Sequence, residues 1–157
     1  MRYPLSRVDL VYTAGLFDGE GCISIPKTKP SLKYRRITPS YELQIKITNN
    51  YLPVLDWLKE NYGGSIYLHS VKLPRNPHPV GDWYLTATKA SEFLQSISPY
   101  LKIKDKEAIV AIGFQEFKDK RFNKKAKKTI SEVNIMEDAH RLLRLLKEDK
   151  NAVLETN

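Results

Sequence analysis

The chain has 157 residues, which indicates one domain spanning residues 1–157 with a core large enough to fold unaided. It contains no apolar run near the roughly 18 residues of a membrane helix, no signal-peptide core, and a single cysteine, Cys22, which excludes an intramolecular disulfide and a cysteine-based zinc site. The formal net charge of +8 suits a polyanion (DNA, RNA or an anionic membrane surface), or simply a soluble basic protein, and does not choose among them.

The first third of the chain predicts a helix followed by a hairpin. A helix is expected from about Arg7 to Gly19, with Ser6 or Asp9 capping its start. A strand follows at Cys22–Lys27. The stretch Thr28–Ser40 contains two prolines and four basic residues, which indicates strand ends and a hairpin loop.

The remaining elements alternate between strands and helices. Apolar residues occupy every second position of Tyr41–Thr48, which predicts a strand with one buried and one polar face. A helix is expected at Leu52–Tyr62, before Gly63-Gly64, and a second hairpin from Ser65–Leu73 and Asp82–Thr88. The last predicted helices are Lys89–Ser96, Asp105–Lys118 and Ser131–Lys150.

The predicted order is therefore α-β-β-α-β-β-α followed by two further helices. Because the strands come as hairpins, we expect a largely antiparallel sheet and an α+β fold. One face of the sheet would pack on helices. The other would be polar and basic with exposed aromatics, and such a face can lie in the major groove of DNA.

The segment YTAGLFDGEG, at the end of the first predicted helix, contains two glycines at helical spacing. Gly15 and Gly19 share one helix face, and with Ala14 beside them that face has almost no side chains. Glycine within a helix costs about 1 kcal/mol relative to alanine. The bare face therefore suits close approach of a second helix, whereas the plainer interpretation is an ordinary helix with a glycine end.

Two acids, Asp18 and Glu20, lie at the C-terminal end of the same helix, where the backbone dipole disfavours negative charge. Their presence indicates a compensating cation, and carboxylate oxygens suit Mg²⁺. If two such helices crossed at their glycines, the acids would meet at a two-fold axis. A metal there could activate water and stabilise the leaving oxygen of a phosphodiester. The alternative is two solvated carboxylates.

The segment TAGLFDGEG resembles the signature of the LAGLIDADG homing endonucleases, with Thr13 in place of the leading leucine and Glu20 in place of the final aspartate. The segments LQIKITNN and SISPYLKIKDKEA are similar to later blocks of that family. The resemblance implies the αββαββα fold, its antiparallel sheet forming a DNA-binding saddle, plus C-terminal helices. It also implies a site-specific endonuclease that cuts both strands of a long pseudo-palindromic DNA target during intron homing, using Mg²⁺ or Mn²⁺.

The same resemblance implies roles for residues around the motif. Glu20 matches the metal-binding catalytic acid, and the carbonyl of Gly19 is a further metal ligand. Asp18 either binds metal or supports the helix end. The residues expected at a helix–helix dimer interface are Ala14, Gly15, Asp18 and Gly19.

Three further residues match positions near the family's active site. Asn49 falls where relatives place a polar residue that orients water, although asparagine also favours turns. Lys104 falls at the family's catalytic lysine and could stabilise charge on the phosphate. Lys102 is its nearby rival, and either lysine could simply contact phosphate. The basic residue that some relatives carry after Asn49 is missing, because Tyr51, Leu52 and Pro53 occupy that stretch.

Residues on the polar sheet face and in the hairpin loops, together with Lys102, are the predicted DNA contacts, either to base edges or to phosphate. They are Ser24, Thr28, Tyr34, Arg35, Arg36, Glu42, Gln44, Lys46, Tyr67, His69, Lys72, Arg75, Asp82, Tyr84, Thr86 and Lys102.

A second copy of the motif would indicate a monomeric enzyme. The nearest candidate, IVAIGFQEF at Ile109–Phe117, lacks the second glycine and the DGEG end. We therefore expect a C2 homodimer acting on double-stranded DNA, without a membrane. The alternatives on the same fold are an RNA-splicing maturase and a non-catalytic DNA-binding protein. The resemblance also implies a chloroplast, a mitochondrion or the archaeal cytoplasm as the place of action.

Overall fold

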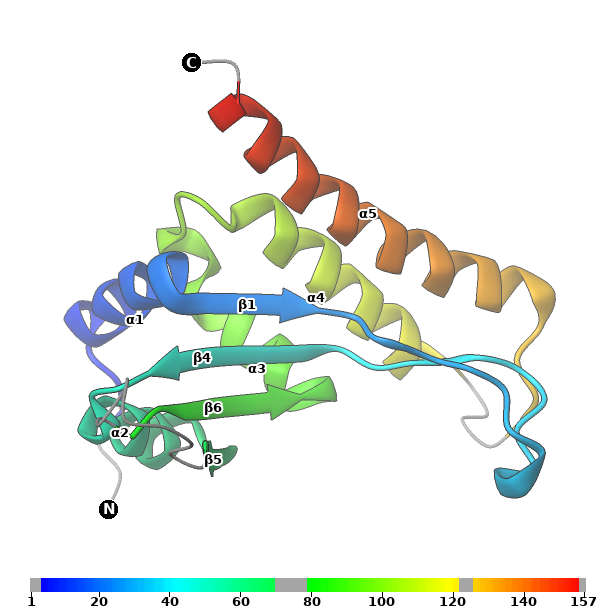
Figure 1. Ribbon diagram of the computed structural model, residues 1–157, viewed down its shortest axis with the longest axis horizontal. Coiled ribbons are helices and arrows are strands. Elements are labelled where there is room, and N and C mark those ends of the chain that lie inside the picture. Colours follow the sequence, from blue (N-terminus) through cyan, green and yellow to red (C-terminus); the bar gives the residue numbers. More distant parts are fainter. Residues whose placement is uncertain (1–3, 70–78, 122–125, 156–157) are drawn as a thin grey trace.

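The computed structural model describes residues 4–69, 79–121 and 126–155. A four-stranded antiparallel sheet lies in front of the helices in Figure 1, with strand order β1-β4-β6-β5. Its strands are β1 Gly21–Ser24, β4 Gln44–Asn49, β5 Ser65–Leu68 and β6 Gly81–Thr86. The helices are α1 Arg7–Glu20, α2 Leu52–Tyr62, α3 Ala87–Ile97, α4 Asp105–Lys120 and α5 Ile130–Glu155, with short 3₁₀ turns η1 Leu32–Tyr34 and η2 Ser98–Tyr100.

The predicted αββαββα order and α+β class are confirmed, with α4 and α5 following it. Helix α2 has the predicted bounds, and α1 begins at Arg7, directly after Ser6, which was one of the two predicted capping residues. The Ser6 hydroxyl accepts the N–H of Asp9, and the Asp9 carboxylate accepts the N–H of Ser6, which forms a reciprocal capping box. No helix in the described ranges is long and apolar enough to cross a membrane.

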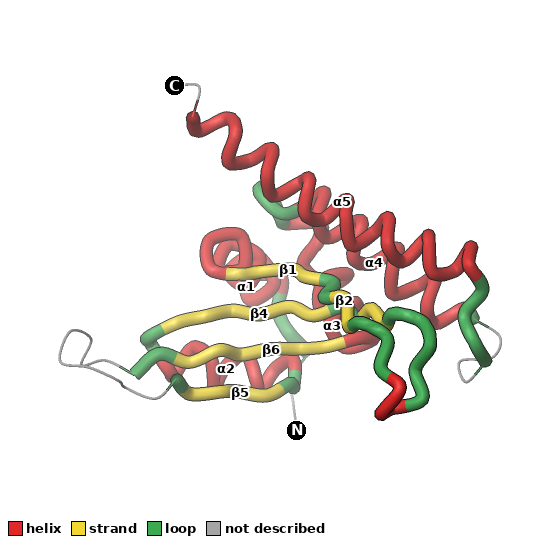
Figure 2. Tube along the Cα trace, turned by 45° about the vertical axis from the view of Figure 1, so that its right-hand side comes forward, coloured by secondary structure: helices red, strands yellow, loops and turns green. Residues whose placement is uncertain are grey.

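The first predicted hairpin is divided into two parts, where the sequence predicted continuous strands. The chain leaves the main sheet after β1, at a proline, Pro26, that has no N–H to donate to a strand partner. The opposite strand breaks at Leu43, whose carbonyl accepts the N–H of Ala87 instead. The outer part forms a separate antiparallel pair, β2 Lys27–Thr28 with β3 Ser40–Tyr41. We refer to residues 27–41 as the ribbon, which projects beyond the sheet in Figures 1 and 2.

The core lies between the rear face of the sheet and the helices. Ile45 and Ile47 on β4, and Trp83 and Leu85 on β6, are buried at alternate positions. The Trp83 indole donates to the carbonyl of Gly63 at 2.8 Å, which ties β6 to the end of α2. Burial of this face leaves the opposite face of each strand in solvent and fixes which side chains can meet a ligand.

Candidate functional site

Asp18, in the last turn of α1, anchors the segment that leads into α4. Its carboxylate accepts the backbone N–H groups of Lys102 at 2.7 Å, Ile103 at 3.2 Å and Lys104 at 3.0 Å. The residue is only 9% exposed. These charge-assisted bonds tie the segment just before α4, which begins at Asp105, to the end of α1.

Lys104 supplies a cation at the C-terminal end of α1. Its side-chain ammonium donates to the backbone carbonyl of Asp18. The last turn of α1 contains no basic residue of its own, so a distant lysine compensates the negative end of the helix dipole. Lys102 is exposed two positions earlier. The two acids at this helix end predicted a compensating cation. Lys104 provides at least part of that positive charge.

Glu20 ends α1 and is exposed beside exposed Gly19. The chain then turns directly into β1 at Gly21, where an added Cβ would lie 2.5 Å from the carbonyl oxygen of Phe17. Only glycine permits this close approach, which places the carboxylate of Glu20 at the junction of helix and sheet. Within the described residues of one chain, no three acidic, histidine or cysteine side chains form a cluster that could hold a metal.

Asn49 is the last residue of β4 and lies near this junction. Because Gly21 pairs with Ile47, β4 continues past the start of β1 toward the end of α1. The side-chain oxygen of Asn49 accepts the N–H of Tyr51 at 2.8 Å, which makes the turn into α2. Asn49 therefore does act as a turn residue, which was one of the two roles that the sequence suggested for it. The amide nitrogen of Asn49 is not used in this bond.

The exposed face of α1 is bare, but it is rotated from the face that the sequence predicted. Beyond the helix itself, an added Cβ at Gly15 or Gly19 would meet no atom of the described residues within 4 Å, so packing within this part of the chain does not require either glycine. Ala14 and Asp18 were predicted on this face, yet both are buried. Each lies one residue, about 100° of helix rotation, from a glycine, and this rotation turns it toward the chain's own core.

Two apolar residues that the prediction missed extend the bare face toward the start of α1. Val8 is 76% exposed and Tyr12 is 53% exposed. With Gly15 and Gly19 they follow spacings of four, three and four residues, which is one helical stripe. This spacing from the two glycines, visible in the sequence, could have placed both residues on the exposed face. The exposed stripe is thus apolar at one end and without side chains at the other.

The outward face of the sheet brings the predicted polar residues of four strands into three rows. Strand register aligns the first row as Ser24, Gln44 and Thr86, the second as Cys22, Lys46, Tyr84 and Ser65, and the third as Thr48, Asp82 and Tyr67. All of them except Thr48 and Ser65 line a shallow hollow of about 510 Å³. Cys22, Thr48 and Ser65 were not among the predicted contacts, although alternation with Ser24, Lys46 and Tyr67 places them on this face.

Asp82 organises the centre of the face. Its carboxylate accepts the hydroxyl of Thr48 at 2.5 Å, and lies 3.3 Å from the Lys46 ammonium and 3.0 Å from Nε2 of His69. Burial raises the pKa of Asp82, but these three partners outweigh burial and hold the pKa below its ordinary value. Asp82 was predicted to contact DNA directly. Its carboxylate instead holds two donors, Lys46 and His69, at the surface.

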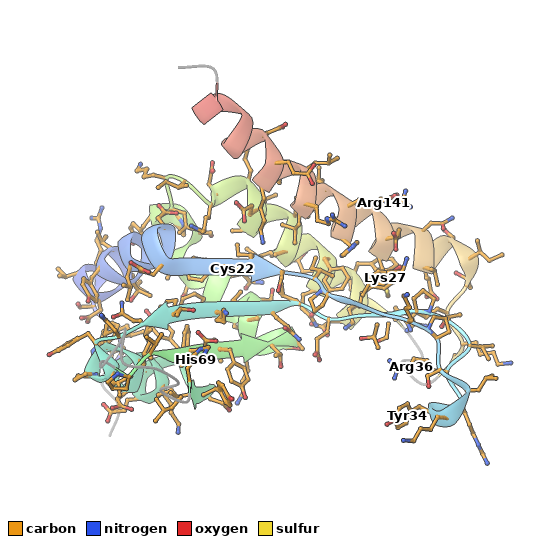
Figure 3. All side chains as sticks on the ribbon, viewed as in Figure 1. Cys22, Lys27, Tyr34, Arg36, His69 and Arg141 are labelled. Atoms are coloured by element: carbon orange, nitrogen blue, oxygen red, sulfur yellow. The ribbon has the colours of Figure 1, made fainter. Side chains whose placement is uncertain are left out.

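The other predicted contacts lie away from this hollow. Figure 3 shows Tyr34 and Arg36 on the projecting end of the ribbon, and His69 and Cys22 over the sheet. Arg35 lies beside them with a left-handed backbone, at φ 51°. The remaining predicted contacts are Thr28, exposed in β2, Glu42, exposed between β3 and β4, and Lys72 and Arg75, which lie outside the described residues.

The model of the family described as LAGLIDADG endonuclease matches residues 13–119, more than half of the chain. The chain belongs to this family. No curated protein matches it. The matched region begins with the glycine motif of α1 and extends to the last turn of α4, so it includes the sheet, Asp18, Glu20 and Lys104.

Solved structures share the fold of this LAGLIDADG chain at low sequence identity. The homing endonuclease I-CvuI, in complex with the I-CreI target in the presence of magnesium and with the DNA not cleaved, has a TM-score of 0.60 and 14% identity, over 87% of this chain and 95% of that one. The archaeal intron-encoded I-Vdi141I, complexed with DNA, has a TM-score of 0.67 and 15% identity, over 88% and 84%. I-SmaMI, bound to cleaved DNA, has a TM-score of 0.65 and 15% identity, over 89% and 45%.

Proposed function

We propose that this LAGLIDADG chain is a site-specific endonuclease that hydrolyses both strands of a long DNA target. The observation that carries the proposal is the division of labour between the two acids of the motif. Asp18 is buried and bound to three backbone amides, whereas Glu20 is exposed at the helix–sheet junction. An exposed carboxylate beside a polar sheet face is available to a metal and to a phosphate at that face.

The donor set at this junction fits Mg²⁺ or Mn²⁺. The Glu20 carboxylate is a hard oxygen ligand, and Gly19 lies in the last helical turn, where carbonyls lack intrahelical partners. These two residues would hold the metal, while Asp18 would keep the supporting segment in place. When bound, such a metal lowers the pKa of water and neutralises charge on a phosphodiester.

Lys104 has a separate task in this proposal. Its ammonium donates to the carbonyl of Asp18, which lies two residues before Glu20 in the last turn of α1. This bond holds the ammonium at the end of α1. In this position it can stabilise negative charge that develops on a phosphate oxygen. Asn49, with its amide nitrogen outside the turn bond, can orient water near the same junction.

A second copy of the chain would complete the site. The stripe of Val8, Tyr12, Gly15 and Gly19 is exposed, and a Cβ added at either glycine would meet no atom of the described residues beyond the helix itself within 4 Å. Pairing this stripe with its symmetry mate would bring two Glu20 residues together, in an isologous C2 interface. The chain also covers most of I-CvuI but less than half of I-SmaMI, as one unit of a two-unit assembly would.

The sheet face supports double-stranded DNA as the substrate. Lys46, His69 and Gln44 can donate to base edges, Tyr84 and Thr86 can add contacts, and the net charge of +8 favours phosphate. I-CvuI, I-Vdi141I and I-SmaMI were each solved with DNA. An RNA-splicing maturase of the same fold is the second candidate, because charge serves RNA equally well.

The test is selection from a library of randomised pseudo-palindromic duplexes with Mg²⁺ or with chelator. We expect double-strand cuts at one long site, and only with Mg²⁺. Retention of a duplex without cutting would contradict catalysis and favour a DNA-binding role. Failure to bind any duplex, together with binding of the intron RNA, would favour the maturase.

A further inference from the structure

Helix α5 is fastened to the base of the ribbon through one carboxylate. Glu137 lies 2.7 Å from the ammonium of Lys27 on β2 and accepts the hydroxyl of Tyr41 on β3. It therefore bonds to both strands of the ribbon at once. Tyr41 is buried, so this contact is made at the edge of the core. Figure 3 shows Lys27 beneath α5, near Arg141, which pairs with Glu137 at 3.1 Å.

The same helix covers the outer edge of the strand that leads into the ribbon. His140 Nδ1 lies 2.7 Å from the carbonyl oxygen of Ile25, which can only accept, so Nδ1 carries the hydrogen. The ammonium of Lys147 donates to the carbonyl of Ile23. These bonds satisfy one carbonyl of β1 and one directly after it, and they leave this part of the edge covered.

Two lysines hold the returning strand of the ribbon. Lys118, near the end of α4, donates to the carbonyl of Tyr41 at 2.8 Å, and Lys128 donates to the carbonyl of Pro39 at 3.3 Å. The start of α5 is itself fixed, because Glu132 accepts the Thr129 N–H at 2.8 Å and pairs with Arg121 at 2.9 Å. The base of the ribbon is thus held on both strands by α4, α5 and Lys128, which lies directly before α5.

The far end of the ribbon carries side chains suited to DNA and exposed to solvent. Leu32 is 87% exposed and Tyr34 is 66% exposed, next to Arg35 and Arg36. The distance from Lys27 to this end is roughly 20 Å, at about 3.3 Å per extended residue. A tilt of about 10° at the base would therefore move the end by about 3.5 Å, close to one base-pair step.

We propose that Glu137 is a positioning residue for DNA recognition, which sets the angle of the ribbon and so selects the base pairs read in the outer part of each half-site. The proposal rests on the DNA-cleaving function proposed above. Glu137 touches no DNA in this scheme and acts through Lys27 and Tyr41. We call the contacts of Glu137 with Lys27 and Tyr41 the clamp. Loss of the clamp would lower discrimination between base pairs at the outer positions and leave the site at Glu20 intact.

The first test needs no DNA and so stands apart from the nuclease proposal. Backbone hydrogen exchange is compared for wild type, Glu137→Gln, Lys27→Met and the double variant, with Asp138→Asn as control. Asp138 is the exposed neighbour on α5, and its replacement changes net charge equally. We expect about tenfold faster exchange within residues 27–41 in each clamp variant, with no further gain in the double variant and unchanged β4 and β6. The proposal would be overturned if residues 27–41 of Glu137→Gln exchanged at the wild-type rate, or if the exchange rate rose equally throughout the sheet.

The second test measures recognition on the target selected for the wild type. Each base pair is varied in turn, and kcat and KM are measured for wild type, Glu137→Gln and Asp138→Asn. We expect Glu137→Gln to lose about tenfold discrimination at outer positions, with unchanged kcat on the best site and unchanged discrimination at the centre. Uniform loss at every position, or the same loss in Asp138→Asn, would refute a positioning role. If wild type cuts no DNA, the nuclease proposal fails, while the exchange result still decides whether the clamp exists.

Discussion

Replacement of each motif acid by its amide should separate a structural carboxylate from a catalytic one. In Asp18→Asn, the amide oxygen can still accept from Lys102 and Ile103, but the NH₂ group then faces the N–H of Lys104. One charge-assisted bond is lost, the other two weaken, and a donor is left without an acceptor at a site only 9% exposed. With hydrogen bonds to charged groups worth about 1.5–3 kcal/mol each, we expect destabilisation of about 2–4 kcal/mol.

Urea denaturation followed by tryptophan fluorescence and circular dichroism measures this difference in the free energy of unfolding. A loss of 3 kcal/mol corresponds to a decrease in Tm of about 6–12 °C for a domain of this size. Glu20→Gln, at an exposed position, should remain within about 0.5 kcal/mol of wild type. Equal stability of the two variants would refute the assignment of Asp18 as the anchor of the segment before α4.

Three further predictions concern the dimer, the sheet face and the clamp. Gly15→Leu should leave the chain folded, because none of the described residues beyond the helix itself lies within 4 Å of an added Cβ there, but it should give a monomer by light scattering, and an unchanged dimer mass would contradict the interface. Asp82→Asn should destabilise the fold by about 1–3 kcal/mol and lower the ratio of specific to non-specific DNA affinity, because Lys46 and His69 lose their shared acceptor; a ratio equal to wild type would count against this role. Hydrogen bonds from Lys27 and Tyr41 lower the pKa of Glu137 from 4.5 to about 2. This carboxylate therefore stabilises the fold above about pH 4.5 and loses its effect as pH falls toward 2, so the stability gap between wild type and Glu137→Gln should close over that range; a gap unchanged at pH 3 would be evidence against the ion pair.

The element order and the inward faces of the strands were predictable because they depend on local patterns. Alternation identified Ile45, Ile47, Trp83 and Leu85 as buried, and Ser6 was one of two residues predicted to cap the first helix. The family followed from a short motif with distinctive glycines and acids. These features are all set by residues within one or two helical turns, or one strand, of each other.

The roles of individual charged groups were not predictable, because their partners are distant in sequence. The sequence places Asp18 at the end of a helix, but not against amides of residues 102 to 104. Likewise, Glu137 reads as one more acid on an amphipathic helix until the fold brings Lys27 and Tyr41 to it. The face of α1 was misassigned by one residue because glycine spacing alone does not fix which side the core occupies.

The most direct test of the central claim is cleavage of the selected target by wild type and by Glu20→Gln under single-turnover conditions with Mg²⁺. We expect Glu20→Gln to bind the target with affinity within about threefold of wild type and to cut both strands at least about 100-fold more slowly. If Glu20→Gln cuts at the wild-type rate, Glu20 is not the metal-binding acid, and the proposed active site at the end of α1 is wrong.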